Sequence, residues 1–235
     1  LTDDDYRNPL HYAAEFGHAD CLRYLISAKG DIHARDVSES TVLMASTRHI
    51  DCMQLLIDAN ADVEAKTNVG TAYRTALMDA TMWGCSECIQ LLLDSKANID
   101  VRNRDGLSAL MLAAREGRAD SWQLLVDANA DIEARDEKGS SAVMLAASKG
   151  HANCTQLLLD RKADIEAVND AGISVLMMAA AGASTECVQH VIDAVRSMFN
   201  VTNTSHRRGQ VSSAEPESSS AVKTKKRKRD DPRQQ

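Results

Sequence analysis

Apolar and polar residues alternate along this chain with a period of about 33 residues. Six apolar runs each follow a polar residue, and these polar residues lie 33, 34, 33, 33 and 33 positions apart: Asn8, Thr41, Thr75, Ser108, Ser141 and Ser174. Asn, Thr and Ser are preferred at the N-cap of a helix, because their side-chain oxygens accept a free backbone N–H. The pattern predicts a helix after each of them.

A second helix is predicted within each repeat. The first apolar run is rich in Ala, Leu and Met, as at residues 110–114, and in four repeats a glycine that can end the helix follows it: Gly17, Gly84, Gly117 and Gly150. The next run places apolar residues at i, i+3 and i+4, as at residues 154–159, which predicts one buried helical face. An Ala-Asp-Ile-Glu segment or a variant then forms a finger-like turn. We expect Asn60 and Asn129, just before this turn, to adopt left-handed backbone.

One segment resembles a known repeat signature. Residues 8–13 (Asn-Pro-Leu-His-Tyr-Ala), followed by Gly17 and His18, are similar to the Thr-Pro-Leu-His-x-Ala motif of ankyrin repeats. The resemblance covers residues 3–196 and implies an all-α solenoid of helix-turn-helix units with short finger turns. We place six repeats at about 3–35, 36–67, 68–102, 103–135, 136–168 and 169–196, with 1–196 as the repeat domain.

Several positions depart from the family pattern. Methionine replaces the family's histidine in five repeats, which predicts thioether packing there: Met44, Met78, Met111, Met144 and Met177. Repeat 2 is two residues short between Thr41 and Cys52. Three extra residues precede Thr75, so the Gly70–Arg74 finger should project differently. Trp122 lies on a second helix, where we expect it to pack rather than bind.

Composition narrows the fold class. Hydrophobic residues make up 44 % of the chain but aromatic residues only 3 %, which disfavours an all-β fold. No apolar stretch approaches the roughly 20 residues that span a bilayer, and no signal peptide is present, so we expect a soluble, intracellular protein. Residues 1–196 carry a net charge of −12 and residues 197–235 one of +5. The acidic part favours basic partners and repels nucleic acid.

The residues that could carry chemistry have simpler interpretations. Five cysteines occupy one position of the repeat, and we interpret them as small buried residues too far apart for disulfides: Cys21, Cys52, Cys88, Cys154 and Cys187. Cys85 and Cys88 form a Cys-x-x-Cys pair, but no second pair stands at zinc-site spacing. No motif for a catalytic nucleophile, phosphate loop or zinc protease is present. We expect no enzyme activity, no cofactor and no metal.

The resemblance places a partner-binding surface on the fingers and on the outer ends of the first helices. Carried onto this sequence, it implies these contact residues: Arg7, Glu15, Phe16, Ser40, Arg74, Met82, Trp83, Leu107, Arg115, Glu116, Ser148, Lys149 and Ile173. Aromatic residues and Arg usually dominate binding energy, so Phe16, Trp83, Arg74 and Arg115 are the expected anchors. We expect a monomer that acts as a non-catalytic scaffold or adaptor for a protein partner, and the acidic repeats would suit a partner with a basic segment.

Acidic residues recur along the fingers. One set is Glu64, Asp100, Glu133 and Glu166, and beside it lie Asp31, Asp62, Asp131 and Asp164. Spaced by one repeat, they would form a ridge that attracts a basic peptide. The alternative is that the Asp side chains hydrogen-bond their own turns, which we favour for the Asp set.

The segment 197–235 has a different composition. It is rich in Ser and loses the helical periodicity, which predicts disorder. Its basic cluster resembles a monopartite nuclear-import signal: Lys223, Lys225, Lys226, Arg227, Lys228 and Arg229. The sequence leaves two other roles open for the cluster, loose nucleic-acid binding and docking on the acidic repeats. We therefore expect a location in the nucleus, or in nucleus and cytoplasm. Because the chain begins at Leu1 rather than Met, an alternative is that it is the recognition arm of a larger enzyme.

Overall fold

The computed structural model describes residues 2–68 and 73–211, and its internal contacts divide the chain into two units after Arg196. Residues 2–196 form pairs of short helices joined by turns. The described residues form these helices: α1 (Pro9–Glu15), α2 (Ala19–Ser27), α3 (Val42–Ala45), α4 (Ile50–Asp58), α5 (Ala76–Trp83), α6 (Ser86–Asp94), α7 (Ala109–Arg115), α8 (Ala119–Asp127), α9 (Ala142–Ser148), α10 (Ala152–Asp160), α11 (Val175–Ala181) and α12 (Thr185–Val211).

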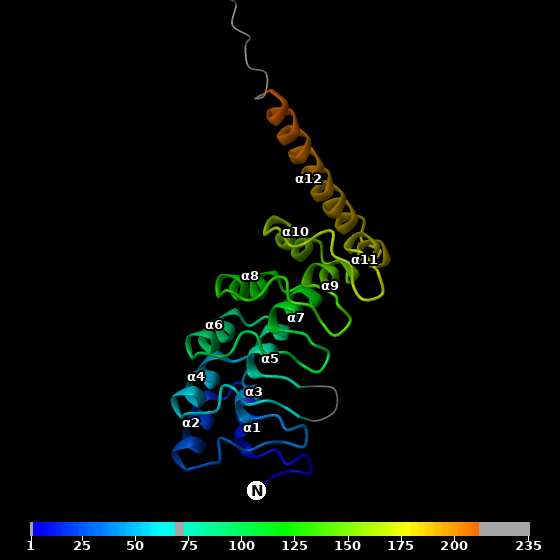
Figure 1. The fold of residues 1–235 in the computed structure, drawn as a ribbon. Helices are drawn as coiled ribbons and strands as arrows, with labels where there is room; N and C mark the ends of the chain where they lie inside the picture. The colour runs from blue at the N-terminus through cyan, green and yellow to red at the C-terminus, as the bar shows by residue number, and fades with distance from the viewer. Residues whose placement is uncertain (1, 69–72, 212–235) are drawn as a thin grey trace, which may run out of the picture. The chain divides into compact units, whose positions relative to one another are not determined.

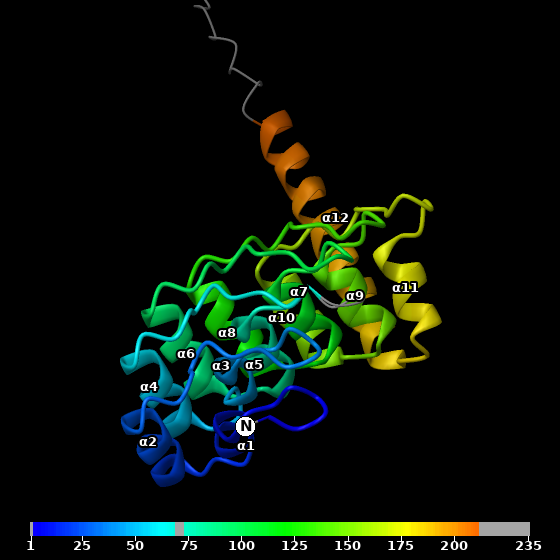
Figure 2. The same ribbon diagram turned by 90° about the horizontal axis from the view of Figure 1, so that it is seen from below.

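The first helices of the pairs lie in one row and the second helices in another (Figures 1 and 2). In the first row α1 contacts α3, α3 contacts α5, and the series continues through α7, α9 and α11. In the second row α2, α4, α6, α8 and α10 contact one another in the same order. The finger turns project beyond the first row (Figure 1). This arrangement confirms the predicted all-α solenoid of helix-turn-helix units.

The six predicted N-cap residues each precede the first helix of a pair. In five of them the side-chain oxygen accepts the backbone N–H three residues later: Asn8, Thr41, Thr75, Ser108 and Ser174. Ser141 also stands at an N-cap, but its side chain makes no capping hydrogen bond. The periodic placement of Asn, Thr and Ser therefore sets where each repeat begins.

The turn after each second helix places a non-glycine residue in the left-handed region. Asn60 and Asn129 both have a φ of 67°, as predicted. Lysine takes the equivalent place in three other repeats, with φ values of 63° at Lys29, 67° at Lys96 and 62° at Lys162. Since lysine is less suited than Asn to this conformation, the three lysines store a small conformational cost.

The ends of the stack differ from its interior. Four of the five methionines in the family's histidine position are buried, between 0 and 4 % exposed, whereas Met177 is 60 % exposed. Met177 lies on α11, and no further pair of the described helices packs over it. Cys21 is exposed while Cys52, Cys154 and Cys187 are buried. Our prediction of burial was wrong for Cys21. This position packs against the preceding repeat, as Sγ of Cys52 does against the carbonyl oxygen of Ala13 at 3.9 Å, and no described helix pair stands before Cys21.

The two-residue deletion in repeat 2 shortens one helix. Helix α3 has four residues, whereas α1, α7, α9 and α11 have seven each. His49, the N-cap of α4, therefore stands eight residues after Thr41, whereas His18 stands ten residues after Asn8. Residues 69–72 lie outside the described residues, so the predicted projection of the Gly70–Arg74 finger does too.

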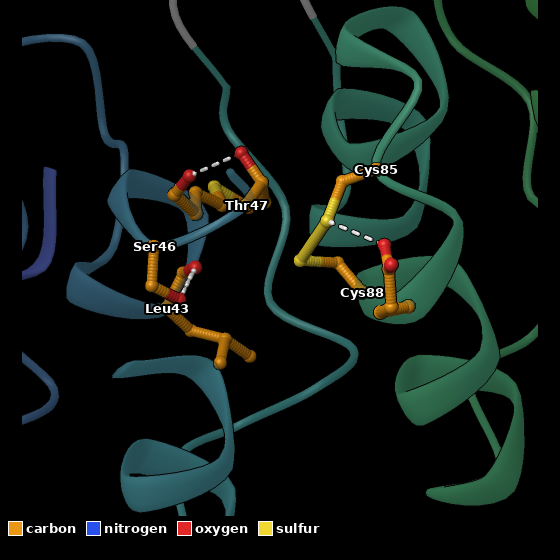
Figure 3. The surroundings of a disulfide bond; sticks show 7 residues. Leu43, Ser46, Thr47, Cys85 and Cys88 are labelled. Atoms are coloured by element: carbon orange, nitrogen blue, oxygen red, sulfur yellow. Dashed lines mark hydrogen bonds between the residues drawn. A yellow bond between two sulfur atoms is a disulfide. The ribbon is translucent and has the colours of Figure 1, made fainter. Parts of the chain in front are cut away.

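The structure pairs two cysteines that we expected to be unlinked. Cys85 and Cys88 form a disulfide, with their Cα atoms 5.3 Å apart (Figure 3). The sequence argument concerned equivalent positions in neighbouring repeats, which are too far apart for a disulfide. Cys85 is instead the N-cap of α6 and Cys88 lies in its first turn, so the two thiols meet within one repeat. Trp122 is fully buried, as expected.

Helix α12 extends further than the sequence predicts. It runs to Val211, so residues 197–211, which we expected to be disordered, are helical. No proline and no glycine occurs before Gly209 in this segment to end the helix. The rest of the predicted tail lies outside the described residues. Within the described ranges, no helix is long and apolar enough to cross a membrane.

Candidate protein-binding groove

A groove of about 490 Å³ lies where the first three repeats present their first helices and fingers. Helices α1 and α3, the end of α5 and the turns before them supply its walls. Its lining residues are Asp5, Arg7, His11, Glu15, Asp36, Val37, Ser38, Ser40, Met44, Ala45, Thr47, Arg48, Arg74 and Trp83. Five of the predicted contact residues are among them, namely Arg7, Glu15, Ser40, Arg74 and Trp83.

Arg7 is held in place by its neighbours at one end of the groove. Its guanidinium forms an ion pair with the carboxylate of Glu15, and this hydrogen bond raises the pKa of Arg7. The same guanidinium lies 4.6 Å from the centre of the Tyr12 ring. The hydroxyl of Tyr12 donates to Asp3 at 2.5 Å, which lowers the pKa of that carboxyl. The charge of Arg7 is therefore largely neutralised within the protein.

His11 joins the first two repeats beneath the groove. It is 1 % exposed, and its Nδ1 accepts the backbone N–H of Asn8 at 3.2 Å. Its Nε2 lies 3.3 Å from the carbonyl oxygen of Ser40 in the next finger. Burial lowers the pKa of His11, so the ring is neutral at pH 7. A neutral imidazole donating from Nε2 fits both contacts.

Arg74 is fixed by a buried carboxylate. Its Nε lies 3.3 Å from Oδ1 of Asp79, which is 8 % exposed. The backbone of Arg74 exchanges two hydrogen bonds of 2.9 Å with Thr67 across the finger. Burial raises the pKa of Asp79 to about 6, although Arg74 acts in the opposite direction. Asp79 thus carries most of its charge at pH 7 and pairs with Arg74.

Arg48 and Trp83 line the groove together. The guanidinium carbon of Arg48 lies 4.9 Å from the centre of the Trp83 ring, a cation–π contact between repeats 2 and 3. The Trp83 side chain is 57 % exposed and Arg48 is also exposed. A large apolar surface beside a cation is thus presented to solvent.

The remaining predicted contact residues do not line this groove. Leu107 is 3 % exposed and belongs to the core, so its side chain offers almost no surface to a partner. Phe16 is 60 % exposed and stacks beside Tyr12, with ring centres 6.4 Å apart. Arg115 and Glu116 pair with each other at 3.0 Å. Met82 is not a lining residue but lies beside the groove, because its sulfur accepts from Nη1 of Arg74 at 4.0 Å. The others belong to later repeats: Ser148, Lys149 and Ile173.

Sequence reasoning missed Arg48, Asp5 and Asp36. Counting forward from Thr41 fails in repeat 2 because of the two-residue deletion. Counting back from His49, the N-cap of α4, places Arg48 where the other repeats have their turn glycine, next to the outer end of the first helix. Asp5 and Asp36 lie at finger positions for which the family pattern gave no signal.

The acidic finger residues hold the fingers together. Oδ1 of Asp31, Asp62, Asp131 and Asp164 accepts the backbone N–H two residues later at 2.9–3.0 Å, as we favoured for this set. Glu64 accepts the N–H of Asn98 at 2.6 Å, and Glu133 that of Asp164 at 3.1 Å, in the next finger. These carboxylates are engaged within the solenoid and are less available to a partner.

Two further predictions concern the basic cluster and metal binding. The basic cluster at Lys223, Lys225, Lys226, Arg227, Lys228 and Arg229 lies outside the described residues. Within the part of the chain that is described, no group of three His, Cys, Asp or Glu side chains could hold a metal ion.

Comparisons with known proteins agree with the fold. A model of ankyrin repeats in three copies matches residues 1–67, 64–136 and 110–204. The ankyrin repeat domain of human ASB11 is similar in structure, with a TM-score of 0.73, 22 % identity and coverage of 80 % of this chain and 84 % of that chain. The ankyrin repeat domain of Bcl-3 gives a TM-score of 0.70 at 28 % identity, covering 83 % of this chain and 85 % of that one. No curated protein matches. The chain belongs to the ankyrin-repeat family.

Proposed function

We propose that the repeat domain is a non-catalytic adaptor that binds a protein partner in the groove of repeats 1–3. Ankyrin repeats are generally protein–protein interaction modules. The observation that carries the proposal is the exposed Trp83 beside Arg48 in the wall of a groove that crosses three repeats. Exposed aromatic and Arg side chains at a concave surface are typical anchors of protein interfaces.

The geometry supports binding rather than turnover. Two of the three arginines in the groove are neutralised by carboxylates of the protein, Arg7 by Glu15 and Arg74 by Asp79. The one histidine in the groove wall, His11, is buried and engaged on both ring nitrogens. These groups fix the shape of the groove and leave its apolar and cationic wall for a partner.

Affinity capture tests the proposal. Native chain, a Trp83→Ala variant and a Tyr24→Ala control would be used as baits in the same extract. Tyr24 is also an exposed aromatic, 74 % exposed, but it lies on α2 in the second row. We expect a partner retained by the native chain and the control but lost with Trp83→Ala, by about tenfold or more. Equal recovery with all three baits would contradict the proposal.

We also propose that the basic cluster at residues 223–229 directs the chain to the nucleus. Support comes from six Lys and Arg residues within seven positions. A fluorescent fusion of the full chain, compared with a variant in which these six residues are Ala, tests this. Nuclear accumulation that depends on the cluster is the expected result, and equal distribution of the two fusions would exclude it.

A further inference from the structure

The three arginines of the groove differ in how their charge is balanced. Arg7 pairs with Glu15, and Arg74 pairs with Asp79. Arg48 has no carboxylate partner among the described residues. The described contact of its guanidinium is with the ring of Trp83. Within the groove, Arg48 is therefore a cation left for an external group.

The stacked geometry leaves Arg48 suited to a carboxylate. With the guanidinium over the indole face, its planar edge still presents N–H donors in the fork arrangement that matches a carboxylate. The neighbouring indole also shields such an ion pair from water on one side, which strengthens it. Trp83 thus both orients Arg48 and offers an apolar surface for an adjoining side chain.

The finger wall determines which end of the groove an acidic group can occupy. The backbone N–H of Val37 donates to the carbonyl oxygen of Asp5 at 2.9 Å, which brings Asp5 and Asp36 to one place on neighbouring fingers. Oδ1 of Asp36 accepts the N–H groups of Ser38 and Ser40 at 2.8 and 2.9 Å. Both carboxylates line the groove and repel a second negative charge. An acidic side chain is therefore directed toward Arg48.

We propose that the Arg48–Trp83 pair binds the carboxylate of an Asp or Glu side chain in an extended segment of the partner protein. An adjoining apolar side chain of that segment would pack on Trp83. The net charge of residues 1–196 led us to expect a basic segment, but that charge acts at long range and Arg48 acts at contact. The proposal rests on the groove being the partner site.

A random dodecapeptide display library, selected on the full chain, tests this chemistry without a known partner. Enriched peptides would be synthesised with a fluorophore and titrated against the native chain, Arg48→Ala and Arg23→Ala. Arg23 is the matched control: it is exposed, carries no described ion pair and lies on α2. Because Arg48 is exposed, its truncation should leave the thermal melting curve unchanged.

We expect peptides enriched in Asp or Glu next to an apolar residue. Their affinity should fall about tenfold in Arg48→Ala and stay unchanged in Arg23→Ala. An Arg48→Glu variant should in turn prefer the same peptides with Lys in place of the acidic residue. Peptides with phosphoserine at that place, compared with Glu, show whether a doubly charged group is accepted equally.

Two results would overturn the inference while leaving the proposed function intact. One is enrichment of basic peptides whose binding depends on Asp36 and not on Arg48. The other is a library without charge preference, or without enriched peptides, although partner capture still requires Trp83. If capture is also insensitive to Trp83→Ala, the groove itself is not the partner site and both proposals fail.

Discussion

Nε2 of His151 lies 3.0 Å from the backbone carbonyl oxygen of Arg115, so the start of one second helix is joined to the end of the preceding first helix. The same relationship links His49 to Glu15 at 3.0 Å, and Nε of Arg118 to Met82 at 3.0 Å. Each donor is the N-cap residue of its helix. Cys85 occupies this place in repeat 3 and cannot make the contact, so the end of α3, next to Arg48, is not joined in this way to α6.

The histidine contact requires glycine beneath it. Gly117 has a φ of 68°, and a Cβ there would lie 2.6 Å from Nδ1 of His151. Gly172 has a similar φ of 72°, but a Cβ there would meet nothing within 4 Å. We predict that Gly172→Ala costs about 1 kcal/mol, from the backbone alone, and Gly117→Ala about 2–4 kcal/mol. Urea unfolding followed by circular dichroism measures both, and equal losses would show that His151 does not press on this position.

Asp79 should make stability depend on pH. Because burial raises its pKa to about 6 from an ordinary value of 3.8, the folded protein holds a proton that the unfolded chain releases between these values. The contribution of Asp79 to stability is therefore highest below pH 4 and falls as the pH rises through 6, by up to about 3 kcal/mol.

Replacing Asp79 by Asn removes this dependence. At pH 7 we expect Asp79→Asn to be more stable than the native chain by about 1–3 kcal/mol, with the difference vanishing near pH 4. Asp100→Asn, at an exposed finger position, serves as control. Thermal melting at pH 4, 5, 6 and 7 checks the prediction, which a difference that stays constant with pH would contradict.

Lysine at a left-handed position offers a stabilising substitution. Lys162 has a φ of 62°, in the place that Asn60 and Asn129 occupy in other repeats. Lys162→Asn should stabilise the protein by about 0.5 kcal/mol, because Asn tolerates this conformation better. Lys149→Asn, where φ is −97°, should give no gain. A melting temperature that rises in both variants, or in neither, would show that the left-handed backbone at Lys162 is not what limits stability.

The disulfide can be counted chemically. In the unfolded chain without reductant, iodoacetamide should modify four cysteines, Cys21, Cys52, Cys154 and Cys187, and after reduction all six. In the Cys85→Ser variant, five cysteines should be modified without reductant, because Cys88 is then a free thiol. Intact-mass spectrometry gives these numbers directly. Six modified cysteines in the unreduced native chain would show that Cys85 and Cys88 are unlinked.

The fold could be predicted because the signals that determine each helix and turn are local and recur in every repeat. An N-cap residue such as Thr75, or the left-handed Asn129, affects only the backbone within a few positions. The boundaries of each repeat can therefore be predicted from the sequence of that repeat. Packing followed from the same period, as the burial of Trp122 and Met111 shows.

The site was predicted only in part, because it depends on contacts between repeats. Whether Arg48 stacks on Trp83 is set by the packing of repeat 2 against repeat 3. Whether Arg74 is neutralised by Asp79 is set by side-chain positions within repeat 3 that the repeat pattern does not specify. Arg48 was also hidden by the deletion in repeat 2. Leu107 is a case in which the family pattern misleads. It stands at a finger position that the family uses for contacts, yet its side chain is buried here.

Hydrogen–deuterium exchange of the full chain with and without its captured partner tests the central claim most directly. If the groove of repeats 1–3 is the partner site, amides in residues 36–48 and 73–83 should exchange more slowly in the complex, while α2, α4 and α6 change little. Slower exchange confined to the second row of helices, with no change in residues 36–48 and 73–83, would contradict the account.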